Sequence, residues 1–280
     1  MALDESRNQL FIAALGNDSL EVVNLKTRTV KSLKGFSEPQ GVVMLPIQHQ
    51  VFVTNGGDGT GVFLNADTLE VKRRINIGSD ADNVRFDGKR LFVGYGSALA
   101  VLNIQGERQL DVKLEAHPES LQLETDKAGA ATQVFVNVPG ANHVAVIDLE
   151  KRAVVATWPV PASSNFPMAF DSTHHRLLIA TRSPARLIAF DTNSGKVTAN
   201  LETVGDADDV LLDGSRIYVS GGAGFISVVE TRKEELKEVA RVNTAAGART
   251  ALFDPTGKRL FIAVLHRGNQ AASIQVLEVQ

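Results

Sequence analysis

The sequence predicts an all-β fold, a seven-bladed β-propeller of four-stranded antiparallel blades, with the last blade lacking its outer strand. Two observations predict this fold. One apolar strand motif recurs seven times along the 280 residues, at a period of about 40 to 43 residues that is typical of propeller blades. Each period also holds further short strand patterns, punctuated by turn residues, and leaves little room for a helix.

The recurring motif is a continuous run of bulky apolar residues. A run of this length, bounded by turn residues, is typical of a strand that is buried on both faces. The seven copies occupy residues 10–13, 51–54, 91–94, 134–137, 177–180, 217–220 and 260–263.

An alternating strand follows each copy and closes on Asn, Asp or Glu. Short carboxamide and carboxylate side chains accept hydrogen bonds from the backbone N–H groups of a following tight turn, so we interpret these residues as structural. In six repeats a third strand follows, and a short apolar strand then opens the next unit. The alternating strands end at residues 22–24, 63–65, 101–103, 146–148, 189–191, 228–230 and 276–278.

We expect the repeats to form one propeller domain. The last repeat ends one strand early, and Met1 to Asp4 aligns with the innermost strand of a later repeat. Because an open sheet edge presents unpaired backbone groups, we expect the missing strand to lie upstream. Met1 would then be an internal residue of a longer precursor, and the chain as given shows no signal peptide. The repeats lie near residues 1–40, 41–82, 83–119, 120–166, 167–208, 209–248 and 249–280.

Two segments carry a resemblance to a known family. Val51-Phe52-Val53-Thr54-Asn55 is close to the tetrapeptide that names the YVTN family of β-propeller repeats, and Val144 to Leu149 resembles its second signature strand. The resemblance spans the chain and implies a propeller located in the periplasm or outside the cell, and we expect the protein to be a monomer. It implies little about activity, because proteins similar to this family serve many functions.

Composition excludes several classes of function. The net charge of −3 and the pI near 6.1 provide no basic surface for a nucleic acid. No run of about eighteen apolar residues predicts a membrane span. Because the chain has no cysteine, it cannot hold covalent c-type haem or a cysteine-ligated iron–sulfur cluster, and it has no thiolate for catalysis.

The loops that enter the innermost strands are the candidate binding site. Such loops vary freely on a rigid scaffold, and here they are not the similar polar turns expected of plain connectors. Two of them contain Asp-Ala-Asp, at 80–82 and 206–208, and we expect these to face each other across the channel mouth. The predicted ligand-binding residues of these loops are Glu38, Gln40, Asp80, Asp82, Asn83, His117, Glu119, Asn165, Asp206, Asp208, Asp209 and Arg249.

Gathered carboxylates have two interpretations. Like charges are costly together unless a cation, a metal ion or bound protons compensate them, so a divalent cation on Asp80, Asp82, Asp206 and Asp208 is one hypothesis. In the other, each Asp only forms a turn and bonds the backbone. The residues alone leave both open.

The last blade has an enlarged polar loop. Phe261 and the closing Glu278 are 17 positions apart, against 11 to 13 in the other blades. We add His266, Arg267 and Asn269 of this loop to the predicted site, because long loops on a scaffold often carry function. Equivalent loops of other blades hold residues that we interpret as ordinary surface residues, namely Asn55, Tyr95, Asn142 and Arg182.

The leading functional hypothesis is a non-catalytic scaffold that holds a small molecule, a cation or a segment of a partner protein at the channel mouth. The alternative is a metal-dependent enzyme, because lactonases and lyases built on propellers hold a divalent metal with similar residue types. That resemblance is one of fold only, since no ligand set with diagnostic spacing is present. A purely structural propeller that docks proteins through its blade edges is the third hypothesis.

Overall fold

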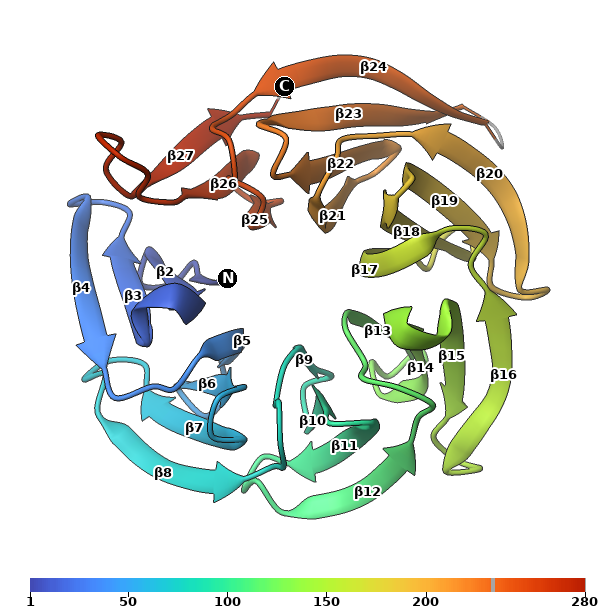
Figure 1. The fold of residues 1–280 in the computed structure, drawn as a ribbon. Coiled ribbons are helices and arrows are strands. Elements are labelled where there is room, and N and C mark those ends of the chain that lie inside the picture. The colour runs from blue at the N-terminus through green and yellow to red at the C-terminus, as the bar shows by residue number, and fades with distance from the viewer. Residues whose placement is uncertain (233–234, 280) are drawn as a thin grey trace. The chain divides into compact units, whose positions relative to one another are not determined.

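The computed structural model describes residues 1–232 and 235–279. Within these residues, 27 β-strands and two short 3₁₀ turns are arranged as seven antiparallel sheets (Figure 1). Six sheets have four strands and the last has three, which confirms the predicted seven-bladed β-propeller and its incomplete last blade. No helix in this part of the chain is long and apolar enough to span a membrane.

The strands fall into two compact units, which we describe separately. Unit 1 holds Met1–Ala141 and Ala145–Ala156, and it contains blades 1 to 4 apart from a few residues of blade 4. Unit 2 holds Asn142–Val144 and the chain from Thr157 onward, and it contains blades 5 to 7.

The strands of unit 1 follow one another across each sheet in sequence order. Blade 1 contains β1 (Ala2–Asp4), β2 (Gln9–Ala14), β3 (Ser19–Asn24) and β4 (Thr29–Lys34). Blade 2 contains β5 (Pro39–Leu45), β6 (Gln50–Asn55), β7 (Thr60–Asn65) and β8 (Val71–Asn76). Blade 3 contains β9 (Val84–Phe86), β10 (Arg90–Tyr95), β11 (Ala98–Asn103) and β12 (Arg108–Lys113). Blade 4 contains β13 (Leu121–Thr125), β14 (Ala131–Val138), β15 (His143–Asp148) and β16 (Ala153–Pro159).

Unit 2 repeats the arrangement. Blade 5 contains β17 (Ser163–Asp171), β18 (Arg176–Ser183), β19 (Ala185–Asp191) and β20 (Lys196–Glu202). Blade 6 contains β21 (Ala207–Asp213), β22 (Arg216–Gly221), β23 (Phe225–Arg232) and β24 (Glu235–Asn243). Blade 7 contains β25 (Ala251–Asp254), β26 (Arg259–Val264) and β27 (Ser273–Glu278). The 3₁₀ turns are η1 (Leu15–Asn17) and η2 (Pro139–Ala141), both in unit 1.

The hydrophobic cores lie between neighbouring sheets. Phe52 and Phe63 of blade 2 pack against Leu91 and Val93 of blade 3, and Phe92 of blade 3 packs in turn against blade 4. Blades 2, 3 and 6 each pack against a neighbour on either side within their unit, so their second and third strands are apolar on both faces. In contrast, the fourth strands are mostly exposed, as the pattern of β4 and β8 shows.

The Asn and Asp residues that close the third strands have the structural role that the sequence predicts. The Oδ1 atom of Asn24 accepts bonds from the N–H groups of Lys26 and Thr27, at 3.0 and 2.9 Å. Asn65 and Asp148 cap the corresponding turns in the same way. These side chains satisfy turn N–H groups that no strand partner can reach.

Three innermost strands begin earlier than the sequence analysis expects. The sequence predicts Gln40, Asn165, Asp208 and Asp209 to lie in entering loops, whereas they lie within β5, β17 and β21. Each strand contains a bulge at this point, where the register to its neighbour shifts. The extra residue of a bulge interrupts the apolar pattern, so the segment looks like a loop in the sequence.

A buried hydroxyl at the end of the second strand ties one blade to the next. In blade 2, Thr54 is fully buried; its Oγ1 accepts the N–H of Gly41 at 2.8 Å and donates to the carbonyl of Asp82 at 2.5 Å. In blade 6, the buried Ser220 donates in the same way to the carbonyl of Arg249. The hydroxyl residue at the fourth position of the motif, Thr54 or Ser220, therefore fixes the backbone of a candidate site residue in the following blade, Asp82 or Arg249.

This tie predicts a large difference between two substitutions at one position. Thr54→Val should lower the free energy of unfolding by about 2–4 kcal/mol, because it leaves the partly buried N–H of Gly41 and carbonyl of Asp82 without this partner. Thr54→Ser keeps the hydroxyl and should cost about 1 kcal/mol or less. Urea denaturation measures both, and equal losses in the two variants would contradict the role of the hydroxyl.

Candidate functional site

The entering segments of six blades share a burial pattern. Each contains a buried residue beside side chains that are at least partly exposed, and in the last segment the preceding Gly247 is buried as well. The buried residues are Pro39, Ala81, Pro118, Asn165, Ala207 and Ala248. The innermost strands that these segments open lie side by side within each unit, β5 with β9 and β9 with β13 in unit 1, and β17 with β21 and β21 with β25 in unit 2. The segments therefore present their outward side chains next to one another at one end of the blades.

The residue before the buried one has a left-handed backbone in five of these segments. Its φ is +46° at Glu38, +54° at Asp80, +61° at Ser164, +54° at Asp206 and +81° at Gly247. Asp and Gly tolerate this region better than most residues. The first Asp of each Asp-Ala-Asp therefore has a structural explanation, whereas the second, Asp82 or Asp208, has none of this kind.

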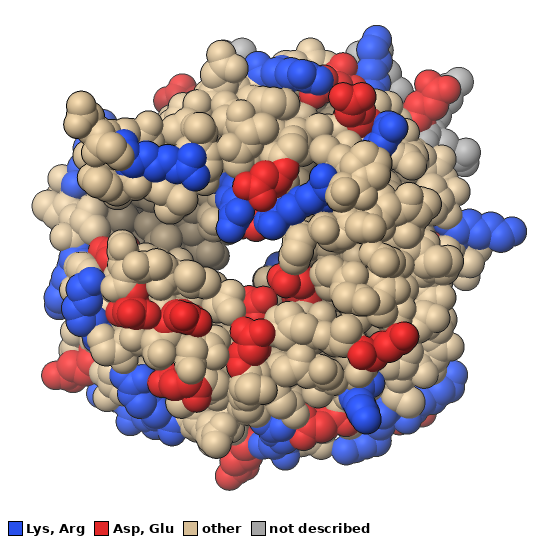
Figure 2. Space-filling view, in the orientation of Figure 1, with Lys and Arg blue, Asp and Glu red and all other residues tan. Residues whose placement is uncertain are grey.

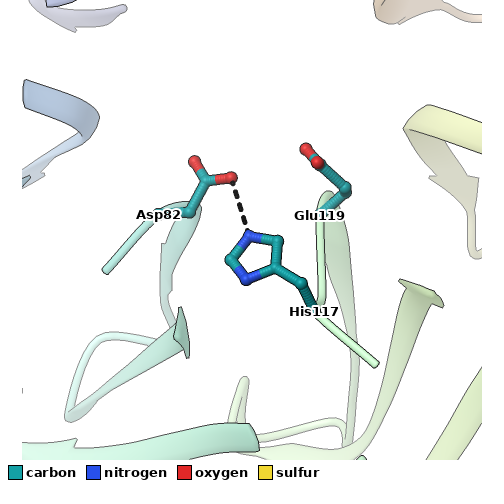
Figure 3. Close-up of side chains that lie close together, drawn as sticks. All are labelled: Asp82, His117 and Glu119. Carbon is teal, nitrogen blue, oxygen red and sulfur yellow. Dashed lines mark ion pairs between the residues drawn. The ribbon is translucent and has the colours of Figure 1, made fainter. Parts of the chain in front are cut away.

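In unit 1, the outward side chains form a cluster of carboxylates around one histidine. The Nε2 atom of His117 lies 3.6 Å from Oδ2 of Asp82, and its Nδ1 lies 3.5 Å from Oδ2 of Asp80. Ligating atoms of Asp82, His117 and Glu119 all lie within 4.8 Å of one another (Figure 3). We call Asp80, Asp82, His117 and Glu119 the acidic-histidine cluster.

The neighbouring predicted residues extend this cluster along blades 2 and 3. The amide nitrogen of Gln40 donates to Asp80 at 3.3 Å, while Asn83 accepts a bond from Arg85 at 2.8 Å. The backbone N–H of Glu38 donates to Asp18 at 2.8 Å. Figure 2 shows acidic side chains gathered over the inner strands of these blades.

The surrounding carboxylates raise the pKa of His117 to about 9. The interaction with Asp82 is the main cause, the charge of Asp80 and the carbonyl of Gly96 add to it, and partial burial of the ring opposes it. At neutral pH the ring therefore carries a positive charge, which offsets one of the three carboxylate charges of the cluster.

Unit 2 gathers the second Asp-Ala-Asp in a different way, with two arginines. Arg182 donates from Nη2 to Asp208 at 2.7 Å and from Nε to the carbonyl of Ala207 at 2.9 Å. Arg249 binds Asp206 through Nη1, at 3.1 and 3.2 Å to its two carboxylate oxygens. The two pairs are cross-linked, since Arg182 also lies 3.3 Å from Asp206 and Arg249 lies 3.7 Å from Asp208. We call Asp206, Asp208, Arg182 and Arg249 the ion-pair cluster.

The ion-pair cluster differs from the predicted cation site. Two guanidinium groups face two carboxylates, so Asp206 and Asp208 need no bound cation to offset their charge. Asp209 accepts the backbone N–H of Ala251 at 2.7 Å and thus holds the start of β25. Of the four residues that the sequence suggests as metal ligands, only Asp80 and Asp82 lie in a group with net negative charge.

The structure places the remaining predicted residues as follows. Asn165 is fully buried and donates to the carbonyl of His143 at 3.2 Å. In the enlarged loop of blade 7, Arg267 lies over Gly247, where an added Cβ would come within 2.4 Å of its Nη2 atom. His266 and Asn269 are exposed. The loop thus brings Arg267 to the entering segment of its own blade.

The sequence does not predict the role of three residues near the entering segments of the two units. It predicts Arg182 to be an ordinary surface residue, whereas Arg182 is central to the ion-pair cluster and its guanidinium lies 4.1 Å from the ring centre of Phe166. Asn55 is likewise no surface residue, because it is fully buried at the end of β6 and donates to Thr60 at 2.9 Å. Thr250 adds a hydroxyl bond of 3.2 Å to Asp208. The one sequence signal for the role of Arg182 is that it follows the second strand pattern of its blade, at the place that Asn55 and Tyr95 occupy in theirs.

Comparisons with known proteins show the fold and no family. No protein-family model matches the sequence, and no curated protein matches it. Among solved structures, a chain titled Kuenenia stuttgartiensis Hydrazine Synthase is similar with a TM-score of 0.84 and 16% identity, covering 99% of this chain and 94% of that one. A chain of a Mitotic Checkpoint Complex has a TM-score of 0.80 and 11% identity, covering 94% and 82%.

A third similar structure is a functionally unknown protein from Desulfotomaculum acetoxidans DSM 771. Its TM-score is 0.76 at 12% identity, covering 90% of this chain and 88% of that one. The chain has the β-propeller fold. At these identities the likeness carries no activity from one protein to another.

The raised pKa of His117 predicts a pH-dependent contribution to stability. In the unfolded chain the imidazole titrates near its ordinary value of 6.5. Its stabilising contribution is therefore complete below that pH and is lost as the pH rises through about 9. The free energy of unfolding of the metal-free wild type should exceed that of His117→Gln by about 1–3 kcal/mol at pH 6. This difference should become smaller as the pH rises to about 9.5.

Chemical denaturation at several pH values measures this difference, and NMR titration of the His117 ring measures the pKa itself. A ring that titrates near 6.5 would contradict the contact with Asp82 and Asp80.

The ion-pair cluster predicts a coupling between Arg182 and Asp208. Arg182→Met should lower the free energy of unfolding by about 1–3 kcal/mol, because it leaves two partly buried carboxylates short of a partner. Combining Arg182→Met with Asp208→Asn should lower the free energy of unfolding by about 1 kcal/mol less than the sum of the losses in the two single variants. Arg186→Met in the same blade is the matched control, and additive losses in the double variant would refute the coupling.

Proposed function

We propose that this propeller is a non-catalytic binding scaffold that holds a positively charged ligand at the acidic-histidine cluster. One observation carries the proposal: the carboxylates of Asp80 and Asp82 face the single imidazole of His117. One imidazolium charge offsets only one of these two carboxylates, which favours a cationic ligand, whether a metal ion, an amine or a basic segment of a partner protein. The side chain of Asp80 is 54% exposed, so such a ligand can reach the cluster.

The contrast between the two units supports this choice. Each unit presents an Asp-Ala-Asp at the same turn, but in unit 2 Arg182 and Arg249 already occupy the carboxylates. A cation would have to displace a guanidinium there. In unit 1, Asp80 and Asp82 face one imidazole, so a cation can approach their carboxylate oxygens without displacing a guanidinium.

The resemblance to YVTN repeats extends this proposal to a family and a location. We infer that the chain is a YVTN-type propeller, because Thr54 of the YVTN-like motif makes the bonds between blades that justify its place in the motif. On the same resemblance we propose a monomer that acts in the periplasm or outside the cell.

Calorimetry with spermidine, and separately with a short lysine peptide, tests the scaffold. Asp80→Asn combined with Asp82→Asn should weaken binding at least about tenfold at low salt. Each lost charge removes roughly 1 kcal/mol of attraction to a unit positive charge about 4 Å away in water. Glu150→Gln with Glu202→Gln makes the same change of net charge elsewhere. Equal effects of the two double variants, or no binding of either probe by wild type, would overturn the proposal.

The closeness of Asp82, His117 and Glu119 also fits the alternative of a metal-dependent enzyme at the same end of the blades. Hydrolysis of a lactone or a phosphate ester that is lost in His117→Gln would favour the enzyme over the scaffold. Binding of spermidine without any turnover would favour the scaffold.

A further inference from the structure

Three side chains of the acidic-histidine cluster converge as metal ligands do. Asp82 lies just before β9 in blade 3, and His117 and Glu119 lie just before β13 in blade 4. Each offers one ligating atom, and the three atoms lie within 4.8 Å of one another (Figure 3). None of these residues is fully exposed, so the group lies partly sheltered from water.

The hydrogen bonding of His117 fixes which ring nitrogen can bind a metal. Its Nδ1 atom lies 2.9 Å from the carbonyl oxygen of Gly96 and 3.5 Å from Oδ2 of Asp80. Both oxygens can only accept, so Nδ1 must carry the proton of the neutral ring. In the neutral ring the lone pair is then on Nε2, which faces Asp82, so a bound metal ion would take the place of the proton that Nε2 carries in the charged ring. A metal-binding histidine is oriented in the same way, by a carbonyl or a carboxylate on its other nitrogen.

The distance between His117 and Asp82 suits an ion between them. At 3.6 Å, the Nε2 and Oδ2 atoms are too far apart for a good hydrogen bond. Two ligands that each lie about 2.0–2.1 Å from a tetrahedral Zn²⁺ are themselves separated by about 3.4 Å. The carboxylate of Glu119 supplies the third ligating atom, which lies within 4.8 Å of the other two.

The backbone that carries these ligands is held firmly. The N–H of Asp82 donates to Gly94 at 2.8 Å and its carbonyl accepts the hydroxyl of Thr54, while the N–H of Glu119 donates to Asn137 at 2.9 Å. The buried Ala81 anchors the turn that carries Asp82. Ligands on a rigid backbone lose little conformational entropy when they bind an ion.

We propose that Asp82, His117 and Glu119 bind a divalent transition-metal ion of the Zn²⁺ type, with Asp80 as a positioning residue for the imidazole. One nitrogen and two carboxylate oxygens suit Zn²⁺, Co²⁺ or Mn²⁺, whereas Ca²⁺ and Mg²⁺ prefer oxygen ligands alone. Three protein ligands leave a coordination position for water or for an oxygen atom of a bound molecule. This inference rests on the proposed cation-binding function and names its ligand.

Calorimetry of the chelator-treated full chain with ZnCl₂ tests the site. One ion should bind per chain, with an affinity at least tenfold higher than that of MgCl₂ or CaCl₂. Asp82→Asn, His117→Gln and Glu119→Gln should each weaken Zn²⁺ binding at least tenfold. Thermal melts of the metal-free variants show whether each is folded, so a loss of binding is not mistaken for unfolding.

His174→Gln is the matched control. Its Nδ1 atom lies 2.8 Å from Asp171, so it removes a second histidine–carboxylate pair from the surface. Zn²⁺ binding should be unchanged in this variant. The visible absorption of bound Co²⁺ gives an independent readout, because its intensity rises for four-coordinate geometry and should be lost in His117→Gln.

Two results would overturn the metal site. One is the absence of Zn²⁺ binding by wild type, and the other is Zn²⁺ binding that persists undiminished in His117→Gln. If spermidine still binds in either case and Asp80→Asn with Asp82→Asn abolishes it, the scaffold stands and only the metal ligand is refuted. If neither Zn²⁺ nor spermidine binds, both proposals fail.

Discussion

The burial of apolar second strands between neighbouring sheets is the constraint on which the structure depends. A sheet that is apolar on both faces must be covered on both, and here the cover is the next copy of the same sheet. Phe52 and Phe92 fill such interfaces in unit 1, and Tyr218 fills one in unit 2. Because the interfaces carry the stability, the segments that connect the sheets are free to differ in sequence.

The sequences of the entering segments are nevertheless constrained by packing and hydrogen bonding. Each one buries a residue such as Ala81 or Ala207 and presents side chains on either side of it. A hydroxyl of the preceding blade, from Thr54 or Ser220, bonds the carbonyl of the residue that follows the buried one. Variation is therefore concentrated in side chains that stand on a common, well-supported backbone, which is a favourable arrangement for a binding site.

The charges of the two Asp-Ala-Asp turns are compensated in two different ways. In unit 2, Arg182 and Arg249 compensate the Asp-Ala-Asp carboxylates, so the charges stabilise the molecule itself. In unit 1, His117 is the titratable group between Asp80 and Asp82, and its charge depends on pH in a range where that of an arginine does not. Similar sequence segments thus acquire different chemistry from the residues that neighbouring blades supply.

The sequence by itself determined the all-β propeller, its seven repeats, the incomplete last blade and the turn-capping role of residues such as Asn24. These features follow from local periodicity and turn chemistry, which one chain segment expresses alone. It also identified Asp82, His117 and Glu119 as members of a polar end. Tertiary structure alone decided their grouping, because the spacing of side chains from different blades depends on bulges and left-handed turns that sequence patterns do not reveal. For the same reason, only the structure showed that Arg182, a residue of another blade, neutralises Asp208.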